Sequence, residues 1–195
     1  MEHALRNALN EADFDAAAMV EETVAAWKDP APPKAQTMTR SKLRNFTKKK
    51  KAWAENEMGR RYFLGEGGLH QSYEEAVKWY EKAARQGHAR GQYGLGLMYD
   101  NGKGVPQSYQ KAMEYYELSA RQGDAFAEYN LGCMFYNGHA VEKDVNKARE
   151  LLTRSAKHGY EDAISNLQEL DKEEEEEERK HNKTMNQKES TNEEE

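Results

Sequence analysis

The sequence predicts an all-α fold, an α/α solenoid in which antiparallel helix pairs stack into a superhelix. Three observations support this prediction. A unit of about 36 residues occurs three times, apolar residues recur at helical spacing in two segments of each unit, and glycines follow those segments. One helix pair cannot bury both of its apolar faces alone, so about three stacked units are needed for a stable core.

The repeat is clearest around a glycine within the first helix of each unit. The matching segments are Met58-Gly59-x-x-Tyr62-x-x-Gly65, Leu95-Gly96-x-x-Tyr99-x-x-Gly102 and Leu131-Gly132-x-x-Phe135-x-x-Gly138. Further along, two more sets recur every 36 residues: Ala76, Ala112 and Ala148, and Gly87, Gly123 and Gly159. The first unit has one extra residue near Gly67-Gly68. These matches divide the chain into units at 52–89, 90–125 and 126–161, with a partial fourth unit at 162–168.

Each unit is predicted to form a helix, a glycine turn, a second helix and a second glycine turn. In the second unit, the core candidates of segment 89–101 are Leu95, Met98 and Tyr99. A polar residue four positions before each repeated alanine is expected to cap the second helix. The capping residues are Ser72, Ser108 and Asp144, and Ser72-x-x-Glu75 has the residues of a full capping box.

The repeated glycines are expected to have two roles. Gly87, Gly123 and Gly159 follow a helix, where a residue in the left-handed conformation satisfies the last carbonyl groups. Gly59, Gly96 and Gly132 instead lie inside a helix, where glycine lowers helix propensity by roughly 1 kcal/mol relative to alanine. Because a glycine has no side chain, the second helix can approach closely there, which would explain why the cost is accepted. We expect the repeated alanines to lie on the side of the second helix that faces these glycines.

Residues 1–29 are predicted to form an amphipathic helix. Its apolar stripe runs along one face and comprises Leu5, Leu9, Ala12, Ala16, Met19, Val20 and Trp27. The stripe needs a cover, which is either the first repeat, capped by this helix, or a partner or second copy of the chain. Pro30-Ala31-Pro32-Pro33 ends the helix and forms a stiff spacer.

Residues 30–51 combine this proline-rich linker with a basic strap at 34–51, which holds eight bases and no acid. The main basic residues are Arg40, Lys42, Arg44, Lys48, Lys49, Lys50 and Lys51. The run fits a nuclear-import signal, a phosphate-backbone contact or a membrane-surface patch. It also fits a solvated helix that leads into the first repeat, with Leu43 and Phe46 packed and the lysines in water.

Residues 169–195 are predicted to form an acidic and largely disordered tail that starts as a helical extension. From Asp171 onward the chain carries eleven acids and five bases, a net charge of −6 that equals the net charge of the whole chain. The tail has few apolar residues to offset the entropy of ordering. Its expected role is solubility or contact with a basic partner.

The sequence lacks the residue patterns of common catalytic and metal sites. The six histidines are scattered, and Gly65-x-Gly67-Gly68 lacks the Lys-Ser/Thr of a phosphate-binding loop. One cysteine, Cys133, excludes an internal disulfide framework, and we expect it to be a packing residue. No metal, cofactor or catalytic residue is predicted. Ala16 to Val20 is far too short for a membrane span, so we expect a cytoplasmic or nuclear protein without membrane contact.

The repeated unit resembles the Sel-1-like repeat (SLR), a relative of the tetratricopeptide repeat. The segments Gly91 to Gly123 and Ala125 to Gly159 match the family pattern most fully in their glycine, alanine and aromatic positions. Ala140 replaces a loop glycine, and Leu151-Leu152 replaces a Trp-Tyr pair. The resemblance implies an adaptor whose concave face, made by the first helices, holds a peptide or protein. Some family members are secreted and disulfide-linked, which does not fit a single cysteine.

A helical wheel nominates three positions of each first helix for that groove. They lie roughly opposite the core positions occupied by Leu95 and Tyr99 in the second unit. The nominated residues are Asn56, Arg60, Phe63, Tyr93, Leu97, Asp100, Tyr129, Cys133 and Tyr136. Tyrosines offer apolar area with a hydrogen-bonding tip, which suits a binding groove. The alternative is packing, because helices in a solenoid contact neighbours on two sides.

The leading functional hypothesis is a non-enzymatic adaptor or scaffold that binds a protein or peptide partner. The alternative is a nuclear or nucleic-acid-associated factor that uses the basic strap at 34–51. The two hypotheses differ in salt dependence, because binding of nucleic acid by the strap weakens steeply as salt rises.

Overall fold

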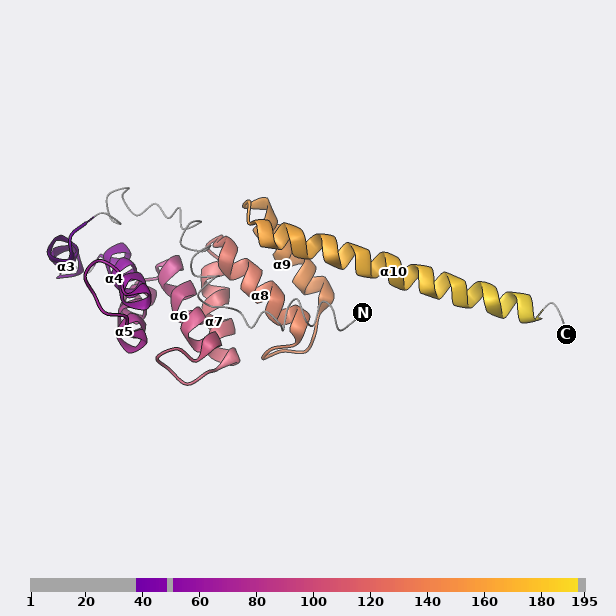
Figure 1. Cartoon of the computed structure of the whole chain (residues 1–195), viewed down its shortest axis with the longest axis horizontal. Helices are drawn as coiled ribbons and strands as arrows, with labels where there is room; N and C mark the ends of the chain where they lie inside the picture. The colour runs from indigo at the N-terminus through magenta and orange to yellow at the C-terminus, as the bar shows by residue number, and fades with distance from the viewer. Residues whose placement is uncertain (1–37, 49–50, 193–195) are drawn as a thin grey trace. The chain divides into compact units, whose positions relative to one another are not determined.

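The computed structural model describes residues 38–48 and 51–192, and these residues form helices joined by short loops (Figure 1). The predicted helix at 1–29 and most of the linker after it lie outside the described residues. The helices are α3 (Arg40–Lys48), α4 (Ala52–Leu64), α5 (Tyr73–Arg85), α6 (Ala89–Asn101), α7 (Tyr109–Ala120), α8 (Ala125–Asn137), α9 (Val145–Lys157) and α10 (Glu161–Asn192).

Helix contacts follow the order of the chain. The pairs α4–α5, α6–α7 and α8–α9 form the three hairpins, and each hairpin contacts the next through α5–α6 and α7–α8. Helices α3 and α10 continue this series at its two ends, on α4 and α9 respectively. The described part of the chain contains no strand. The predicted all-α solenoid of antiparallel helix pairs is therefore confirmed.

The second helices begin at the predicted caps. The side chain of Ser72 accepts a hydrogen bond from the backbone N–H of Glu75, and Ser108 and Asp144 make the same contact in the other units. The full capping box predicted at Ser72 does not form, because its own N–H donates to the carbonyl oxygen of Tyr62 at 2.9 Å. That contact recurs at the other two caps, so it belongs to the repeated geometry.

The glycines inside the first helices allow the close approach that the sequence predicts. A Cβ atom added at Gly59 would lie 2.7 Å from a ring carbon of Tyr80, and one at Gly96 would lie 2.7 Å from a ring carbon of Tyr116. The side chain that faces each glycine therefore belongs to the residue four positions after the repeated alanine, and not to the alanine that we expected there. The alanine itself contributes its backbone, since the carbonyl oxygen of Ala112 would lie 3.3 Å from the same added atom at Gly96.

Helix α3 takes the place of the second helix of a preceding unit. Leu43 lies nine residues before the first residue of α4. Tyr80 and Tyr116 lie at the same distance along the chain before the first residues of α6 and α8. Like those residues, Leu43 is buried, in a cluster that includes Met58 and Leu69. Leu69 comes from the loop that the first unit has extended by one residue. The first unit is therefore covered at its outer end by α3.

Helix α10 includes the expected helical extension at the start of the tail and continues well beyond it. It runs from Glu161 to Asn192, and neither glycine nor proline occurs within it. Its first part packs like the first helix of a fourth unit, with Ala163 and Leu170 buried. Arg149 of α9 then holds Asp171 and Glu174 by ion pairs. Local helix propensity and these contacts continue the helix where burial of apolar groups ends.

No helix among the described residues is both long enough and apolar enough to cross a membrane.

Candidate functional site

The candidate binding surface lies on the first helices α4, α6 and α8, where the nine nominated residues occupy three equivalent positions per helix. We call these the inner, middle and outer positions, in chain order. Of the nine side chains, five are buried and four are half-buried, so none is fully exposed. The three positions differ in what they contact.

The inner position packs one unit against the next. Tyr93 is 1% exposed, and its ring centroid lies 5.9 Å from that of Tyr116 and 5.8 Å from that of Phe126. Tyr129 is likewise buried, and its hydroxyl accepts a hydrogen bond from the side-chain amide of Asn166 in α10 at 3.3 Å. In the first unit this position holds Asn56, which is also buried. The two tyrosines are therefore engaged in packing between units.

The middle position is charged in the first unit and apolar in the next two. Arg60 is buried and pairs with Glu57 and Glu66, with the nearest nitrogen and oxygen atoms 3.0 and 2.8 Å apart. Leu97 and Cys133 are half-buried. Burial raises the pKa of the Cys133 thiol to about 12, so the thiolate is scarce at neutral pH. This agrees with the expected packing role of Cys133 and disfavours a nucleophile.

The outer position carries the polar groups of the surface. Asp100 accepts a hydrogen bond from the hydroxyl of Tyr116 at 3.0 Å, and burial raises the pKa of its carboxyl group. The hydroxyl of Tyr136 donates to Glu173 of α10 at 3.1 Å. Phe63, the equivalent residue of the first unit, is buried, with its ring centroid 5.4 Å from that of Tyr73.

Four of the nine nominated residues therefore retain some exposure, and they form a regular set. Leu97 and Cys133 hold the middle position of consecutive units, while Asp100 and Tyr136 hold the outer one. The first unit adds nothing to this set, because both of its equivalents are buried. The geometry thus concentrates the candidate surface on α6 and α8.

Sequence reasoning missed a set of hydrogen bonds that ties each first helix to the C-terminal end of its partner helix and the turn that follows. Gln122 donates to Gln92 at 2.6 Å in the second unit, and Gln86 donates to Glu55 in the first. Serines add a second contact, since Ser119 donates to the carbonyl oxygen of Ala89 at 2.9 Å. Each donor lies about 30 residues beyond its acceptor, so only an alignment of the units against each other could have found the pairs.

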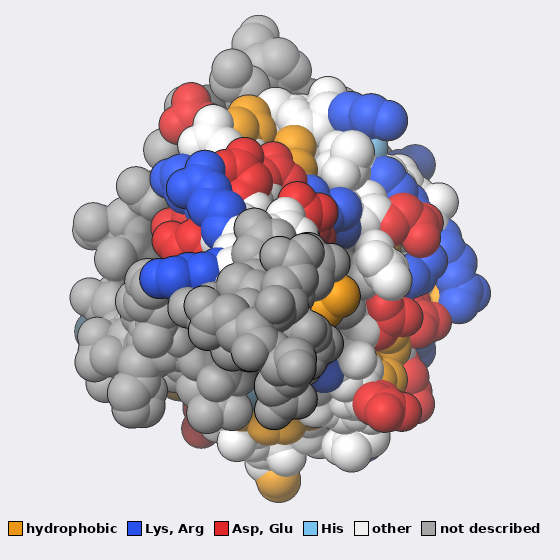
Figure 2. Space-filling view, turned by 90° about the vertical axis from the view of Figure 1, so that its right-hand side faces the viewer, with side chains coloured by type: hydrophobic (Ala, Val, Ile, Leu, Met, Phe, Trp, Pro, Cys, Tyr) orange, Lys and Arg blue, Asp and Glu red, His pale blue; other side chains and the backbone are white. Residues whose placement is uncertain are grey.

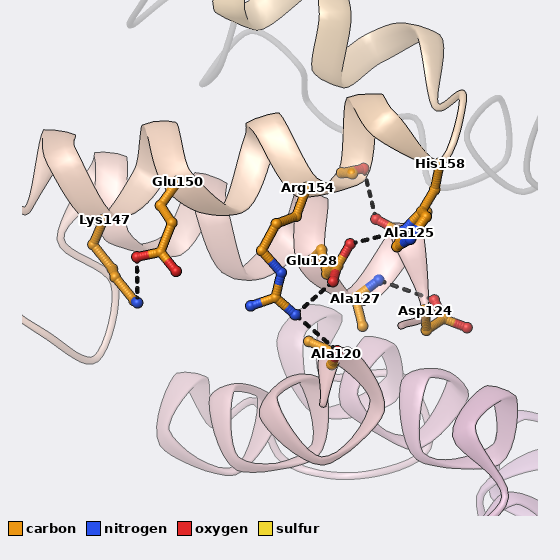
Figure 3. Close-up of polar contacts among 10 residues, drawn as sticks. Ala120, Asp124, Ala125, Ala127, Glu128, Lys147, Glu150, Arg154 and His158 are labelled. Carbon is orange, nitrogen blue, oxygen red and sulfur yellow. Dashed lines mark hydrogen bonds and ion pairs between the residues drawn. The ribbon is translucent and has the colours of Figure 1, made fainter. Parts of the chain in front are cut away.

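In the third unit this contact becomes a charged cluster around Glu128 (Figure 3). Glu128 is 1% exposed, and its carboxylate accepts a hydrogen bond from Arg154 at 2.7 Å. Nδ1 of His158 lies 3.1 Å from the other carboxylate oxygen. Arg154 also donates to the carbonyl oxygen of Ala120 at 3.2 Å, at the end of α7. A buried carboxylate with two basic partners is satisfied, so the cluster joins the second unit to the third.

The basic strap is divided by the structure. Arg40, Lys42, Arg44 and Lys48 are exposed on α3, and Lys51 is exposed just before α4. Lys49 and Lys50 lie outside the described residues. Leu43 packs against the first unit, and these cations are exposed to solvent. The side chain of Phe46, which the lead-in hypothesis also expects to pack, lies outside the described part of the structure.

The described residues offer no constellation typical of metal binding. No three His, Cys, Asp or Glu side chains within residues 38–48 and 51–192 come together so as to hold a metal ion.

At the α10 end of the molecule, positively and negatively charged side chains are mixed on the surface, as Figure 2 shows. What the surface offers chemically is a mixed apolar and hydrogen-bonding strip on α6 and α8.

Comparison with known proteins identifies the repeated unit. A family model described as the Sel1 repeat matches residues 54–88, 89–124 and 125–160. A Sel1 repeat protein from Oxalobacter formigenes has a solved structure that is 32% identical with a TM-score of 0.62, covering 69% of this chain and 56% of that one. No curated protein matches the sequence.

Two further solved structures are similar. One is a protective antigen present in uropathogenic Escherichia coli strains, which displays an SLR fold and is 33% identical, with a TM-score of 0.59. The match covers 64% of this chain and only 27% of the antigen. The other is cysteine-rich protein B of Helicobacter pylori, 26% identical with a TM-score of 0.53, covering 67% of this chain and 98% of that one.

Proposed function

The chain belongs to the Sel1 repeat family, and we propose that it is a non-enzymatic adaptor that binds a protein or peptide partner on its first helices. Stacked helical repeats present an extended surface to which each unit contributes the same positions. The observation that carries this proposal is the pair of half-buried positions that recur on α6 and α8, namely Leu97 with Cys133 and Asp100 with Tyr136.

The composition of these positions defines the kind of partner. Leu97 and Cys133 supply apolar area, and Tyr136 supplies a ring with a polar tip. Nζ of Lys143 lies 4.5 Å from the centroid of the Tyr136 ring, so a cation stands beside the aromatic face. Such a strip suits a peptide that inserts an apolar side chain and presents an acceptor to the ammonium group of Lys143.

The state of the polar groups supports binding over catalysis. Asp100 is held by the Tyr116 hydroxyl, and Tyr136 is held by Glu173. The raised pKa of Cys133 keeps its thiol protonated. A general base or nucleophile needs a free group with a pKa near the working pH, and these groups are engaged or mismatched.

Variants of the strip test the proposal. We expect Leu97→Asp and Tyr136→Asp to reduce the capture of specific partners, measured by quantitative mass spectrometry of material retained by the full chain. Leu118→Asp is the matched control, because Leu118 lies on the second helix α7 and is 41% exposed. Melting temperatures of all three variants establish that they fold.

The supporting result is a set of proteins retained by the wild type and by Leu118→Asp and lost from both strip variants. If every folded variant retains the same proteins at the same level, the strip is not the binding surface. If only Leu118→Asp loses them, the surface lies on the second helices.

A further inference from the structure

Helix α3 carries cations that the rest of the described structure leaves uncompensated. Arg40, Lys42, Arg44 and Lys48 are exposed, and so is Lys51. None of the five forms an ion pair with a carboxylate within the described residues. Several solvent-accessible bases on the repeats instead pair with a carboxylate three or four residues away: Lys78 with Glu75, Arg121 with Glu117, and Lys147 with Glu150.

The arrangement of these cations opposes helix formation. Arg40, Arg44 and Lys48 follow one another at four-residue intervals, which places them on one face of α3. Like charges at this spacing repel and destabilise a helix. Residues 34–51 contain no acid that could offset the repulsion. An anionic partner would remove this cost, whereas nothing in the described chain does.

The charged face is also held in place. Leu43 is fully buried against Ala54, Met58 and Leu69 of the first unit. Just before α3, the guanidinium of Arg61 donates to the carbonyl oxygen of Met38 at 2.9 Å. The basic side chains therefore project from an anchored helix, and binding to them costs less conformational entropy than binding to a mobile basic tail.

We propose that α3, together with Lys51, binds the phosphate backbone of a nucleic acid. Two of the three residues on the basic face are arginines, and a guanidinium donates two parallel hydrogen bonds to a phosphate. Successive members of the face advance by about 6 Å along the helix axis. A polyanion with closely spaced phosphates meets all three at once.

A lipid surface fits these observations less well. A helix that lies on a membrane needs an exposed apolar face that enters the lipid. Of the two apolar residues of α3, Leu43 is turned into the protein and fully buried, while the side chain of Phe46 lies outside the described part of the structure. The described exposed residues of α3 are polar or charged. This surface is distinct from the strip on α6 and α8, so the proposal is independent of the adaptor function.

The expected binding is independent of sequence and sensitive to salt. Three phosphate contacts give a slope of roughly −3 for the logarithm of the binding constant against the logarithm of salt concentration, at about −0.9 per contact on duplex DNA. Non-specific binding of this kind has dissociation constants on the order of 10⁻⁴–10⁻⁶ M at physiological salt.

Fluorescence anisotropy with the full chain and a labelled duplex of arbitrary sequence tests the proposal. The test variant combines Arg40→Gln, Arg44→Gln and Lys48→Gln. The control variant combines Lys78→Gln, Arg121→Gln and Lys147→Gln, which lowers the positive charge equally at solvent-accessible sites on the repeats. We expect the test variant to bind at least about 10-fold more weakly with a shallower salt slope, and the control to bind like the wild type.

Three results would overturn the proposal. The first is wild-type binding by the test variant, and the second is an equal loss in the control, which would indicate a bulk charge effect. The third is a wild type that binds phosphatidylserine vesicles or poly-glutamate but not the duplex. Circular dichroism of both variants ensures that the comparison is made between folded proteins.

Discussion

Glycines within the first helices set how closely the two helices of a unit approach. At Gly96 an added Cβ atom would lie 2.7 Å from Tyr116, a distance that real Cβ contacts essentially never show. At Gly132 the nearest side-chain atom would be Cγ of Leu152, at 3.1 Å. The glycine position of the first helix is therefore more tightly packed in the second unit, where it faces a tyrosine ring, than in the third unit, where it faces a leucine side chain.

This difference predicts a ranking of two substitutions. Gly96→Ala should destabilise the protein by up to about 2 kcal/mol, because an overpacking cost of about 1–3 kcal/mol exceeds a gain in helix propensity of about 1 kcal/mol. Gly132→Ala should cost less, since Leu152 can shift by a few tenths of an ångström. Urea denaturation followed by circular dichroism measures both. Equal stability of Gly96→Ala and the wild type would contradict the close contact.

Asp100 predicts a pH dependence at the scale of one side chain. Burial raises its pKa above the ordinary value of 3.8, so the folded chain retains a proton that the unfolded chain has released. The contribution of Asp100 to the free energy of unfolding therefore falls as pH rises from the pKa of the unfolded chain to the raised pKa of the folded chain. Asp100→Asn removes the titration and keeps an oxygen that accepts from the Tyr116 hydroxyl.

We expect the melting temperature of Asp100→Asn, relative to the wild type, to increase between about pH 3 and about pH 7. Differential scanning calorimetry at several pH values measures the change. Tyr116→Phe is a useful companion, because it removes the hydroxyl and leaves the carboxyl group. A difference between Asp100→Asn and the wild type that stays constant with pH would show that Asp100 titrates normally.

Among the connecting elements, the loop of the third unit carries backbone strain. Ala140 has a φ of 66°, the only non-glycine residue with positive φ among those described. The equivalent residue of the second unit is Gly104, at φ 70°. A left-handed residue with a side chain costs roughly 1–2 kcal/mol, part of which alanine recovers through its lower entropy when unfolded.

Opposite substitutions in these two loops should have opposite effects. Ala140→Gly should stabilise the protein by about 0.5–1 kcal/mol. Gly104→Ala should destabilise the protein by more, for two reasons. The new residue would adopt the same strained backbone conformation, and its Cβ atom would lie 2.5 Å from the backbone of Tyr73. Chemical denaturation of the two variants checks both signs. Destabilisation by Ala140→Gly would mean that the alanine makes a compensating contact.

Helix starts and turns could be predicted from the sequence because they are local. Ser72, Ser108 and Asp144 cap the helices that follow them through a backbone group three residues away. The extent of α10 could not be predicted from composition. Its acidic second half buries little apolar area, and it continues as a helix through local propensity and through Arg149, which lies on another element.

At the scale of the whole molecule, stability should depend on contacts between neighbouring units. Ala163 and Leu170 of α10 are buried against the third unit, whereas the described side chains beyond Glu173 are mostly exposed. The two parts of α10 therefore differ in role. The first covers the end of the stack, and the second extends beyond it.

Two truncations separate these roles. A chain that ends at Glu173 should lose no more than about 1 kcal/mol, because it gives up mainly exposed ion pairs. A chain that ends at Tyr160 should lose on the order of 4 kcal/mol by exposing the apolar surface that α10 covers. Urea denaturation measures both values. A similar loss from the two truncations would indicate that the second half of α10 contributes contacts of its own.

The binding surface was harder to predict than the fold because burial depends on distant segments. Tyr93 and Leu97 lie on the same side of one helical wheel, yet only Tyr93 is enclosed. Its cover comes from Phe126, which is 33 residues further along the chain and in the next unit. Periodicity identifies a helix face, but the packing of consecutive units decides which residues of that face remain exposed.

Photo-cross-linking from single positions of the full chain tests most directly whether the first helices hold the partner. A photoreactive phenylalanine analogue at residue 97 or 136 probes the strip, and the same analogue at residue 118 probes the second helices. We expect partner adducts to form from positions 97 and 136 and not from 118. Adducts from 118 alone would contradict the claim that the first helices hold the partner.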